Sequence, residues 1–312
     1  MQYNSINAMP HYVRFFSKIK AENSRRRNEV KVYISMDAEG ISGIFKLAQV
    51  MPGHPEYDYA RKLMAGDVNA AVAGAFDAGA ETVFVNDAHN SGDNLHITDL
   101  DDRAVLCSGA DRPFTMAEGA QKGFDAALLI GYHTRKGSKG VISHSYAYGS
   151  MVEMRLNDKI ISEYELIGYM IGYYGTPVVF ISGDDIVTAD AKENVPGIHA
   201  VVVKECVSNG AASCIHPNVT ARMIREEVKK ALSNLAEEGI KPMTVEGPVR
   251  IDVRYTAEAQ AWKAMMVPNT ERIGETTVRY HGKDYKEAYL AFVAGAVLAS
   301  SFGDDAALYA HK

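Results

Sequence analysis

The chain has 312 residues, of which 47% are hydrophobic and 23% charged, and its formal net charge is −6. This is the composition of a soluble globular protein, and the acidic balance argues against nucleic acid or an anionic membrane as partner. The three cysteines, Cys107, Cys206 and Cys214, are widely spaced and form no CxxC site. Such spacing is typical of a reducing compartment, so we expect a cytoplasmic protein.

Residues 1–29 differ in charge from the rest of the chain. They carry six basic residues against two acidic ones. The segment has neither the apolar core nor the small-residue cleavage site of a secretory signal. We expect 1–29 to be a disordered or tag-like extension that is not part of the fold.

From residue 30 onward, predicted strands and helices alternate. Short β-branched runs predict strands, and longer segments with apolar residues at helical spacing predict helices. The expected strands are Val30–Met36, Glu81–Val85, Ala126–Ile130, Val152–Leu156, Pro177–Ile181, Ala200–Lys204, Val249–Arg254 and Thr276–Tyr280. The expected helices are Tyr57–Gly79, Glu163–Tyr174, His216–Glu238 and Tyr285–Phe302.

This order predicts an α/β fold with a mainly parallel sheet flanked by helices. We expect residues 30–244 to form a metal-binding catalytic domain. Residues 245–312 are expected to form a smaller α+β lobe, although no linker marks the boundary.

Acidic and histidine side chains follow successive predicted strands. Asp37 and Glu39 follow the first strand, His89 the second and His133 the third. Sites in open α/β sheets gather at the carboxyl ends of the strands, so we expect these four side chains to lie together. Asp37 and Glu39 are two residues apart and would face the same side of an extended chain. Imidazole and carboxylate ligands together suit zinc.

Other polar residues near these strand ends have more than one interpretation. His144 is a ligand, a proton-transfer group or neither. Glu163 is a ligand, or it only favours the dipole of the helix that it opens. Asp87 fits a supporting role beside His89. Asp184 and its neighbour Asp185 either receive the amine of a substrate or cap a helix.

The five candidate ligands suffice for two divalent ions. Three carboxylates offset most of the charge of two such ions, and coordination positions stay open for substrate. Paired ions activate water for hydrolysis. The GxGxxG, Walker A, HExxH and GxSxG motifs are absent, so nucleotide binding and several other hydrolase mechanisms are not indicated.

Several short motifs, in order, resemble the M55 family of zinc-dependent D-aminopeptidases. The first is the segment 36–43, MDAEGISG. The resemblance continues through 85–89 (VNDAH), 131–133 (GYH), 143–145 (SHS) and Glu163, and then through 182–185 (SGDD). It covers roughly residues 30 to 302.

The resemblance implies a role for each candidate. Asp37 would bridge two zinc ions in each subunit, Glu39 and Glu163 would bind one ion, and His89 and His133 the other. His144 would be the catalytic residue, as proton-transfer group, oxyanion stabiliser or nucleophile. The stretch before Asn157 is one residue longer than the family pattern, so Glu165 is the alternative to Glu163. A homo-oligomer, a decamer in the typical member, is also implied.

We therefore expect a di-zinc aminopeptidase that cleaves the N-terminal bond of short peptides, with D-alanyl peptides as one expected class. The residues leave manganese or cobalt open as the metal and leave the chirality of the substrate open. A di-metal phosphoesterase, with phosphate held by Arg135, Lys136 and Lys139, or another amidohydrolase, is one alternative. A non-catalytic metal- or peptide-binding module is the other.

Overall fold

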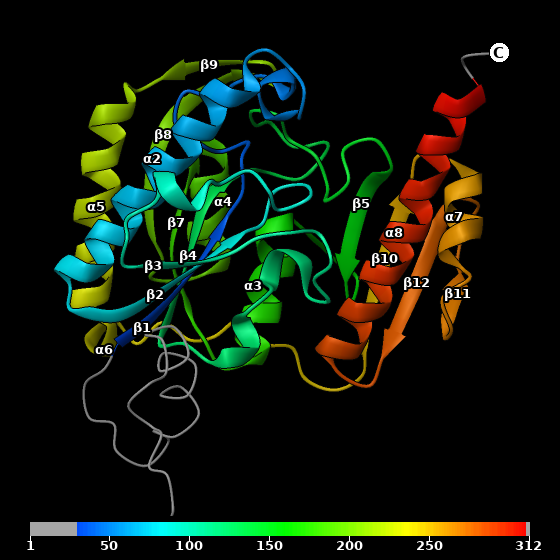
Figure 1. Ribbon diagram of the computed structural model, residues 1–312. Coiled ribbons are helices and arrows are strands. Elements are labelled where there is room, and N and C mark those ends of the chain that lie inside the picture. The colour runs from blue at the N-terminus through cyan, green and yellow to red at the C-terminus, as the bar shows by residue number, and fades with distance from the viewer. Residues whose placement is uncertain (1–29, 310–312) are drawn as a thin grey trace, which may run out of the picture.

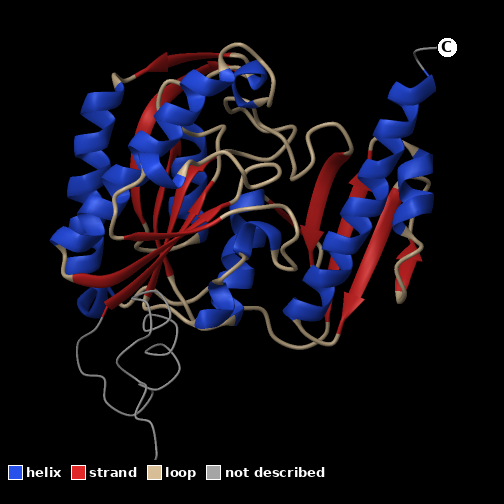
Figure 2. Cartoon of the chain, viewed as in Figure 1, coloured by secondary structure: helices blue, strands red, loops and turns tan. Residues whose placement is uncertain are grey.

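The computed structural model describes residues 30–309, so the predicted extension at 1–29 lies outside the described residues. Figure 1 shows two sheets, with the second standing to one side of the first. Helix α3 (Glu163–Tyr173) lies between them. Figure 2 shows loops gathered in the space between the first sheet and the second. No helix in the described part of the chain is long and apolar enough to cross a membrane.

Within residues 30–309 the first sheet has seven strands, in the order β3-β2-β1-β4-β7-β8-β9. Neighbouring strands are parallel, except that β9 is antiparallel to β8. The predicted α/β fold with a mainly parallel sheet is confirmed. In chain order the strands are β1 (Val30–Met36), β2 (Ala80–Asp87), β3 (Ala104–Cys107), β4 (Ala126–Tyr132), β7 (Val178–Asp184), β8 (His199–Ser208) and β9 (Ala211–Cys214).

Both faces of this sheet are covered, because successive side chains of a strand point to opposite faces. Ile34 packs in the core on one face, with helices α2 (Tyr57–Asp77) and α5 (Pro217–Ser233). Its neighbour Tyr33 belongs to the core on the other face, where α3 and α4 (Asp185–Asn194) pack. Burial on both faces explains why these strands read as continuous apolar runs.

The second sheet, counted over the same residues, has five strands in the order β11-β12-β10-β5-β6. Its pairings are antiparallel, and helices α7 and α8 pack on β10 and β12. The hairpin β5–β6 lies in the predicted catalytic domain, and its strand β5 pairs with β10 of the predicted C-terminal lobe. The domain boundary at residue 244 stays a prediction. The elements are β5 (Met151–Leu156), β6 (Lys159–Ile161), β10 (Val249–Tyr255), α7 (Glu258–Ala264), β11 (Thr270–Arg272), β12 (Thr277–Gly282) and α8 (Tyr285–Tyr309).

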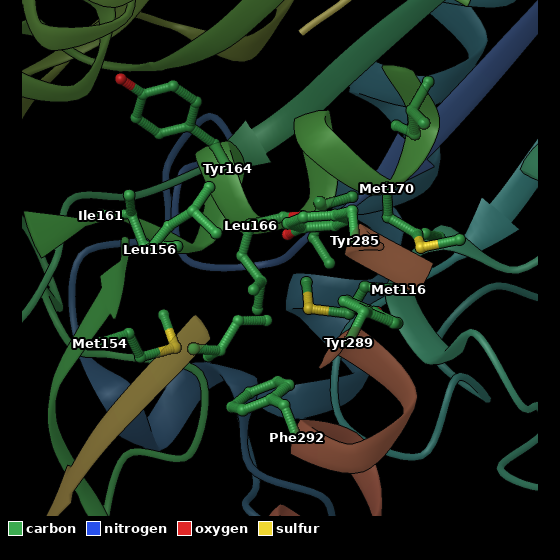
Figure 3. Close-up of a cluster of buried hydrophobic side chains, with 14 of the residues drawn as sticks. Met116, Met154, Leu156, Ile161, Tyr164, Leu166, Met170, Tyr285, Tyr289 and Phe292 are labelled. Carbon is green, nitrogen blue, oxygen red and sulfur yellow. The ribbon is translucent and has the colours of Figure 1, made fainter. Parts of the chain in front are cut away.

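A continuous apolar core joins the two sheets, and Figure 3 shows part of it. Leu166 and Met170 of α3 lie beside Tyr285, Tyr289 and Phe292 of α8. Met154, Leu156 and Ile161 of the hairpin complete the cluster. The Tyr285 hydroxyl donates to the Leu166 carbonyl over 2.7 Å, so the buried phenol is satisfied. This packing fixes the position of α3, whose first residue is Glu163.

Sequence reasoning missed several short elements and joined two helices. Strands β3, β9 and β11 have three or four residues, none of them buried, so they give no apolar run. Helices α4 and α7 were not predicted either. The predicted helix 216–238 is wrong as one element: His216 caps α5, and Asn234 separates it from α6 (Leu235–Glu238). The short 3-10 helices are η2 (Leu47–Val50), η3 (Ile97–Asp99), η4 (Thr115–Ala117) and η5 (Ala120–Lys122).

Candidate metal centre

The loop after β1 places Asp37 and Glu39 against the end of β4. Its backbone pairs with β4, through Asp37 N–H to the Ile130 carbonyl (2.8 Å) and Gly40 N–H to the Gly131 carbonyl (2.7 Å). A Cβ on Gly40 would lie 2.0 Å from the Tyr132 carbonyl oxygen, and one on Gly131 would lie 2.2 Å from the Asp37 oxygen. Only glycine at both positions permits this approach. It brings the loop next to His133.

A buried lysine forms hydrogen bonds with the backbone of the same loop. Lys204, from the middle of β8, has no exposed surface, and its Nζ donates to the carbonyls of Glu39, Ile41 and Ile44. Three acceptors match the three donors of an ammonium group. Burial lowers the pKa of Lys204 to about 8. The residue was not singled out from the sequence, because one lysine inside a strand has no local pattern that marks it.

The two predicted histidines meet the acidic pair at this edge. His89 Nδ1 lies 3.2 Å from Asp37 Oδ1 and 3.3 Å from Glu39 Oε2. His133 Nε2 lies 3.4 Å from Asp37 Oδ2 and 3.7 Å from Glu163 Oε2. Asp37 therefore stands between the two rings, with one oxygen toward each. All five predicted ligands are brought together.

Backbone carbonyls orient the rings of His89, His133 and His144. His89 Nε2 lies 3.1 Å from the Val50 carbonyl oxygen, and His133 Nδ1 lies 2.9 Å from that of Thr134. His144 Nδ1 lies 2.9 Å from the Ile142 carbonyl oxygen. A carbonyl can only accept, so a neutral ring donates its proton there. Its other nitrogen then has a free lone pair, as metal ligation or proton transfer requires.

Glu163 and Glu165, the two alternatives for the fifth ligand, have different surroundings. Glu163 Oε2 faces His133, as described above. Glu165 accepts from the Ser162 N–H (2.8 Å) in a capping box and pairs with Lys159 (2.8 Å). Its side chain is thus committed to the start of α3, and Glu163 is the acid that reaches the other ligands.

The distances add one detail to the arrangement implied by the resemblance. That resemblance placed Glu39 and Glu163 on one ion and the two histidines on the other. In the structure each histidine lies beside one glutamate: His89 beside Glu39, and His133 beside Glu163. Asp37 contributes one oxygen to each group. Asp37 and Glu39 also place ligand atoms within 4.8 Å of His133, so the pairing of ligands with ions stays a prediction.

The donor atoms fit a metal because their hydrogen bonding is incomplete. Buried polar atoms are nearly always satisfied in proteins. Among the described residues, Asp37 Oδ2, Glu39 Oε2, His133 Nε2 and Glu163 Oε2 are buried without a hydrogen-bond partner. Asp37, Glu39 and His133 can each place one ligand atom within 4.8 Å of the others, and so can His133, His144 and Glu163. Zinc is bound by such nitrogen and oxygen sets.

Without a metal, these acids and histidines shift one another's pKa. Burial and the neighbouring Glu39 carboxylate raise the pKa of Asp37 to about 7. Burial favours a neutral His133 ring, but the contact with Glu163 outweighs it and raises the pKa of His133 to about 10. His89 has its pKa raised well above the usual value, against the effect of burial, by Glu39 and Asp37. At neutral pH, when no metal is bound, the His89 and His133 rings are therefore protonated on both nitrogens and carry a positive charge.

Zinc affinity is expected to rise with pH as a consequence. A metal ligand must be a neutral ring, so zinc has to displace a proton from His133 and from His89. At pH values below the His133 pKa of about 10, the apparent affinity for zinc should rise about tenfold per pH unit for each proton that zinc displaces. Competition with a chelator between pH 6 and 9 measures this, and calorimetry in two buffers counts the released protons. An affinity that stays constant over this range would contradict the expectation.

A cavity of about 820 Å³ opens beside the ligands. Its wall includes Asp37, Glu39, His89, Glu163 and His144. The His144 ring stacks on His133 with ring centroids 4.0 Å apart. The Tyr148 ring is tilted against the His144 ring, with centroids 5.4 Å apart. Burial and the charge of His133 lower the pKa of His144. His144 is thus a neutral base on the cavity wall. Residues of α8 also line the cavity, among them Val293, Ala296 and Val297.

The remaining acidic candidates have structural roles. Asp87 accepts from the Asn94 and Leu95 N–H groups at 2.7 Å each, and so fixes the turn that carries His89. Asp184 caps α4 by accepting from Ile186 and Val187 and also accepts from the Val141 N–H. Helix capping is therefore the correct interpretation of Asp184.

The phosphate-binding alternative has no support from the described cavity lining. In that alternative, Arg135, Lys136 and Lys139 would hold a phosphate beside the metal ligands. None of the three lies among the residues that line the cavity in the described part of the chain. The cation found there is Arg112, which sequence reasoning missed because it follows β3, a strand that was not predicted.

Comparisons with known proteins show that the chain is similar to D-aminopeptidases. The profile of the D-aminopeptidase family, Peptidase M55, matches residues 30–294. The chain is 36% identical over 271 residues to the D-aminopeptidase of Bacillus subtilis (strain 168), covering 86% of this chain and 98% of that protein. It also resembles the structure of the Zn-dependent D-aminopeptidase DppA from Bacillus subtilis, described as a self-compartmentalizing protease. The TM-score is 0.83 at 36% identity, over 87% of this chain and 98% of that one.

Proposed function

This chain belongs to the D-aminopeptidase family and is a metal-dependent peptidase; we propose that it releases the N-terminal residue, with a D configuration, from short peptides. The zinc dependence of the related structure and the candidate ligand groups of this chain make zinc its cofactor. The observation that carries the proposal is the convergence of four buried, unsatisfied ligand atoms, from Asp37, Glu39, His133 and Glu163, beside a cavity that the three carboxylates line.

We assign the ligands to two zinc ions. Asp37, Glu39 and His89 would hold one ion, and Asp37, His133 and Glu163 the other, because these side chains are neighbours. Bound zinc would polarise the scissile carbonyl and lower the pKa of a water molecule at the site. Asp37 keeps the two sites adjacent, since its two oxygens face different histidines.

His144 is the residue that we assign to proton transfer. Its Nδ1 is engaged by the Ile142 carbonyl, so Nε2 is the nitrogen available to accept a proton from the attacking water. The same atom can then give the proton to the leaving amine. Stacking on His133 and the hydrogen bond to Ile142 hold the ring in place on the cavity wall.

A paired substrate panel tests the reaction and its chirality. D- and L-alanyl arylamides and the matching alanyl-glycine dipeptides are incubated with the zinc-loaded protein and with a chelator-treated sample. Cleavage of the D series that disappears with the chelator is expected. Cleavage of the L series alone would retain the aminopeptidase and overturn the D configuration. Metal-independent cleavage, or none, would overturn the proposed function.

We also propose that the protein is a homo-oligomer, with a decamer as the size implied by the family resemblance. The self-compartmentalizing relative supports an assembly. Light scattering of the purified protein measures its size. A reducing, cytoplasmic location remains a prediction from the three widely spaced cysteines.

A further inference from the structure

We propose that Arg112 binds the free α-carboxylate of the peptide substrate, so that the enzyme selects short peptides with an unblocked C-terminus. The inference rests on the proposed function. It starts from the charges of the cavity lining. Among the described lining residues Arg112 is the one lysine or arginine, and the lining also includes Asp37, Glu39 and Glu163. A peptide that reaches these metal ligands therefore meets one arginine or lysine side chain that can bind a carboxylate.

The guanidinium group is fixed in place through one nitrogen. Arg112 Nη1 donates to Asn86 Oδ1 over 2.5 Å and to the Asp87 carbonyl over 2.7 Å. Both acceptors are neutral, so no carboxylate neutralises the charge through these bonds. A cation that is anchored before the substrate arrives loses little conformational entropy on binding.

The other edge of the guanidinium is not engaged by these two hydrogen bonds. Nε is buried without a hydrogen-bond partner among the described residues, and both bonds of the side chain leave from Nη1. Nε and Nη2 form the edge on which arginine binds a carboxylate with two parallel hydrogen bonds. A buried unsatisfied donor in a native protein calls for an explanation, and a carboxylate ligand supplies one.

The position of Arg112 relates the carboxylate to the scissile bond. Its Nη1 is bonded to the carbonyl of Asp87, two residues before the ligand His89. Its Nη2 lies against the turn of His89, where a Cβ on Gly92 would come within 2.0 Å of it, and the Gly92 N–H donates to the His89 carbonyl. The carboxylate site and one metal ligand thus share a single turn. Such closeness fits a short peptide better than the interior of a long chain.

The test compares a free-acid substrate with its neutral analogue. The kcat/KM of the zinc-loaded full chain is measured for D-alanyl-glycine and D-alanyl-glycinamide. Loss of a charge-assisted hydrogen-bond pair should make the amide about ten- to a hundredfold poorer for the unmodified enzyme. Arg112→Gln should abolish this preference by slowing the free acid while leaving the amide nearly unchanged. Arg112→Lys, which keeps the charge but not the planar edge, should retain part of the preference.

A matched arginine separates recognition from a purely structural role. Arg61 donates to the carbonyls of Asn94 (2.6 Å) and Asp93 (3.2 Å), in the segment just after the same turn, but it does not line the cavity as described. Arg61→Gln should keep the preference for the free acid. If Arg112→Gln slows both substrates equally, or if the unmodified enzyme treats acid and amide alike, the inference is wrong although the aminopeptidase stands. If the unmodified enzyme cleaves neither, the proposed function fails and the inference with it.

Discussion

Replacing Asp37 by Asn is expected to remove zinc and peptide hydrolysis together. The side chain is 2% exposed, and its two oxygens face the two histidines, so it takes part in both proposed sites. The Asn amide has one neutral oxygen in place of the two carboxylate oxygens that share a charge. Its NH₂ group would face the ring of His89 or His133 and cannot bind a metal ion there. We expect kcat to fall by at least about 10³-fold, the scale on which positioned electrostatic groups act in catalysis.

Zinc content per subunit, measured by elemental analysis beside kcat, checks this expectation. Asp67→Asn is the matched control. Asp67 is 2% exposed and accepts from the Ser42 N–H over 2.9 Å, so it supports the same loop from α2, but it does not belong to the ligand groups found among the described residues. The control should keep its zinc. A zinc-loaded, active Asp37→Asn variant would show that the ligand assignment is wrong.

The part of the site that sequence reasoning located best comes from three neighbouring strands. β2, β1 and β4 are adjacent and parallel, so the segments that follow them lie at one edge of the sheet. Asp37, Glu39, His89 and His133 all occupy that edge. Strand patterns alone therefore predicted their proximity, because parallel order follows from the alternation of strands and helices.

Residues outside this edge could not be placed from local patterns. Glu163 enters the site at the start of α3, which the core between the two sheets holds in place. Strand β5 of the hairpin before it pairs with β10, where Leu156 is opposite Ile251 and Met151 is opposite Tyr255, so the partners lie 95 to 104 positions apart in the chain. Lys204 and Arg112 act through tertiary contacts, with the carbonyls of a distant loop and with the end of β2. Such contacts depend on how the elements pack, which the pattern of a single segment does not encode.

Replacing His144 by Gln is expected to slow catalysis while both ions stay bound. His144 lines the cavity, and its free Nε2 is the proposed proton acceptor. General acid–base groups contribute about 10² to 10⁴-fold, so kcat should fall within that range with little change in KM. Unchanged zinc content is the feature that separates this variant from Asp37→Asn.

The result also distinguishes the possible roles of His144. His144, His133 and Glu163 can each place one ligand atom within 4.8 Å of the other two. If His144 is a metal ligand, His144→Gln should therefore lose one ion. A proton-transfer role predicts that added imidazole restores part of the activity of His144→Ala, because a diffusing base can take up the same proton. A nucleophile role predicts a covalent intermediate that can be trapped with the unmodified enzyme. Because Nδ1 is engaged by the Ile142 carbonyl and Nε2 is not, the geometry favours rescue by imidazole with full zinc content.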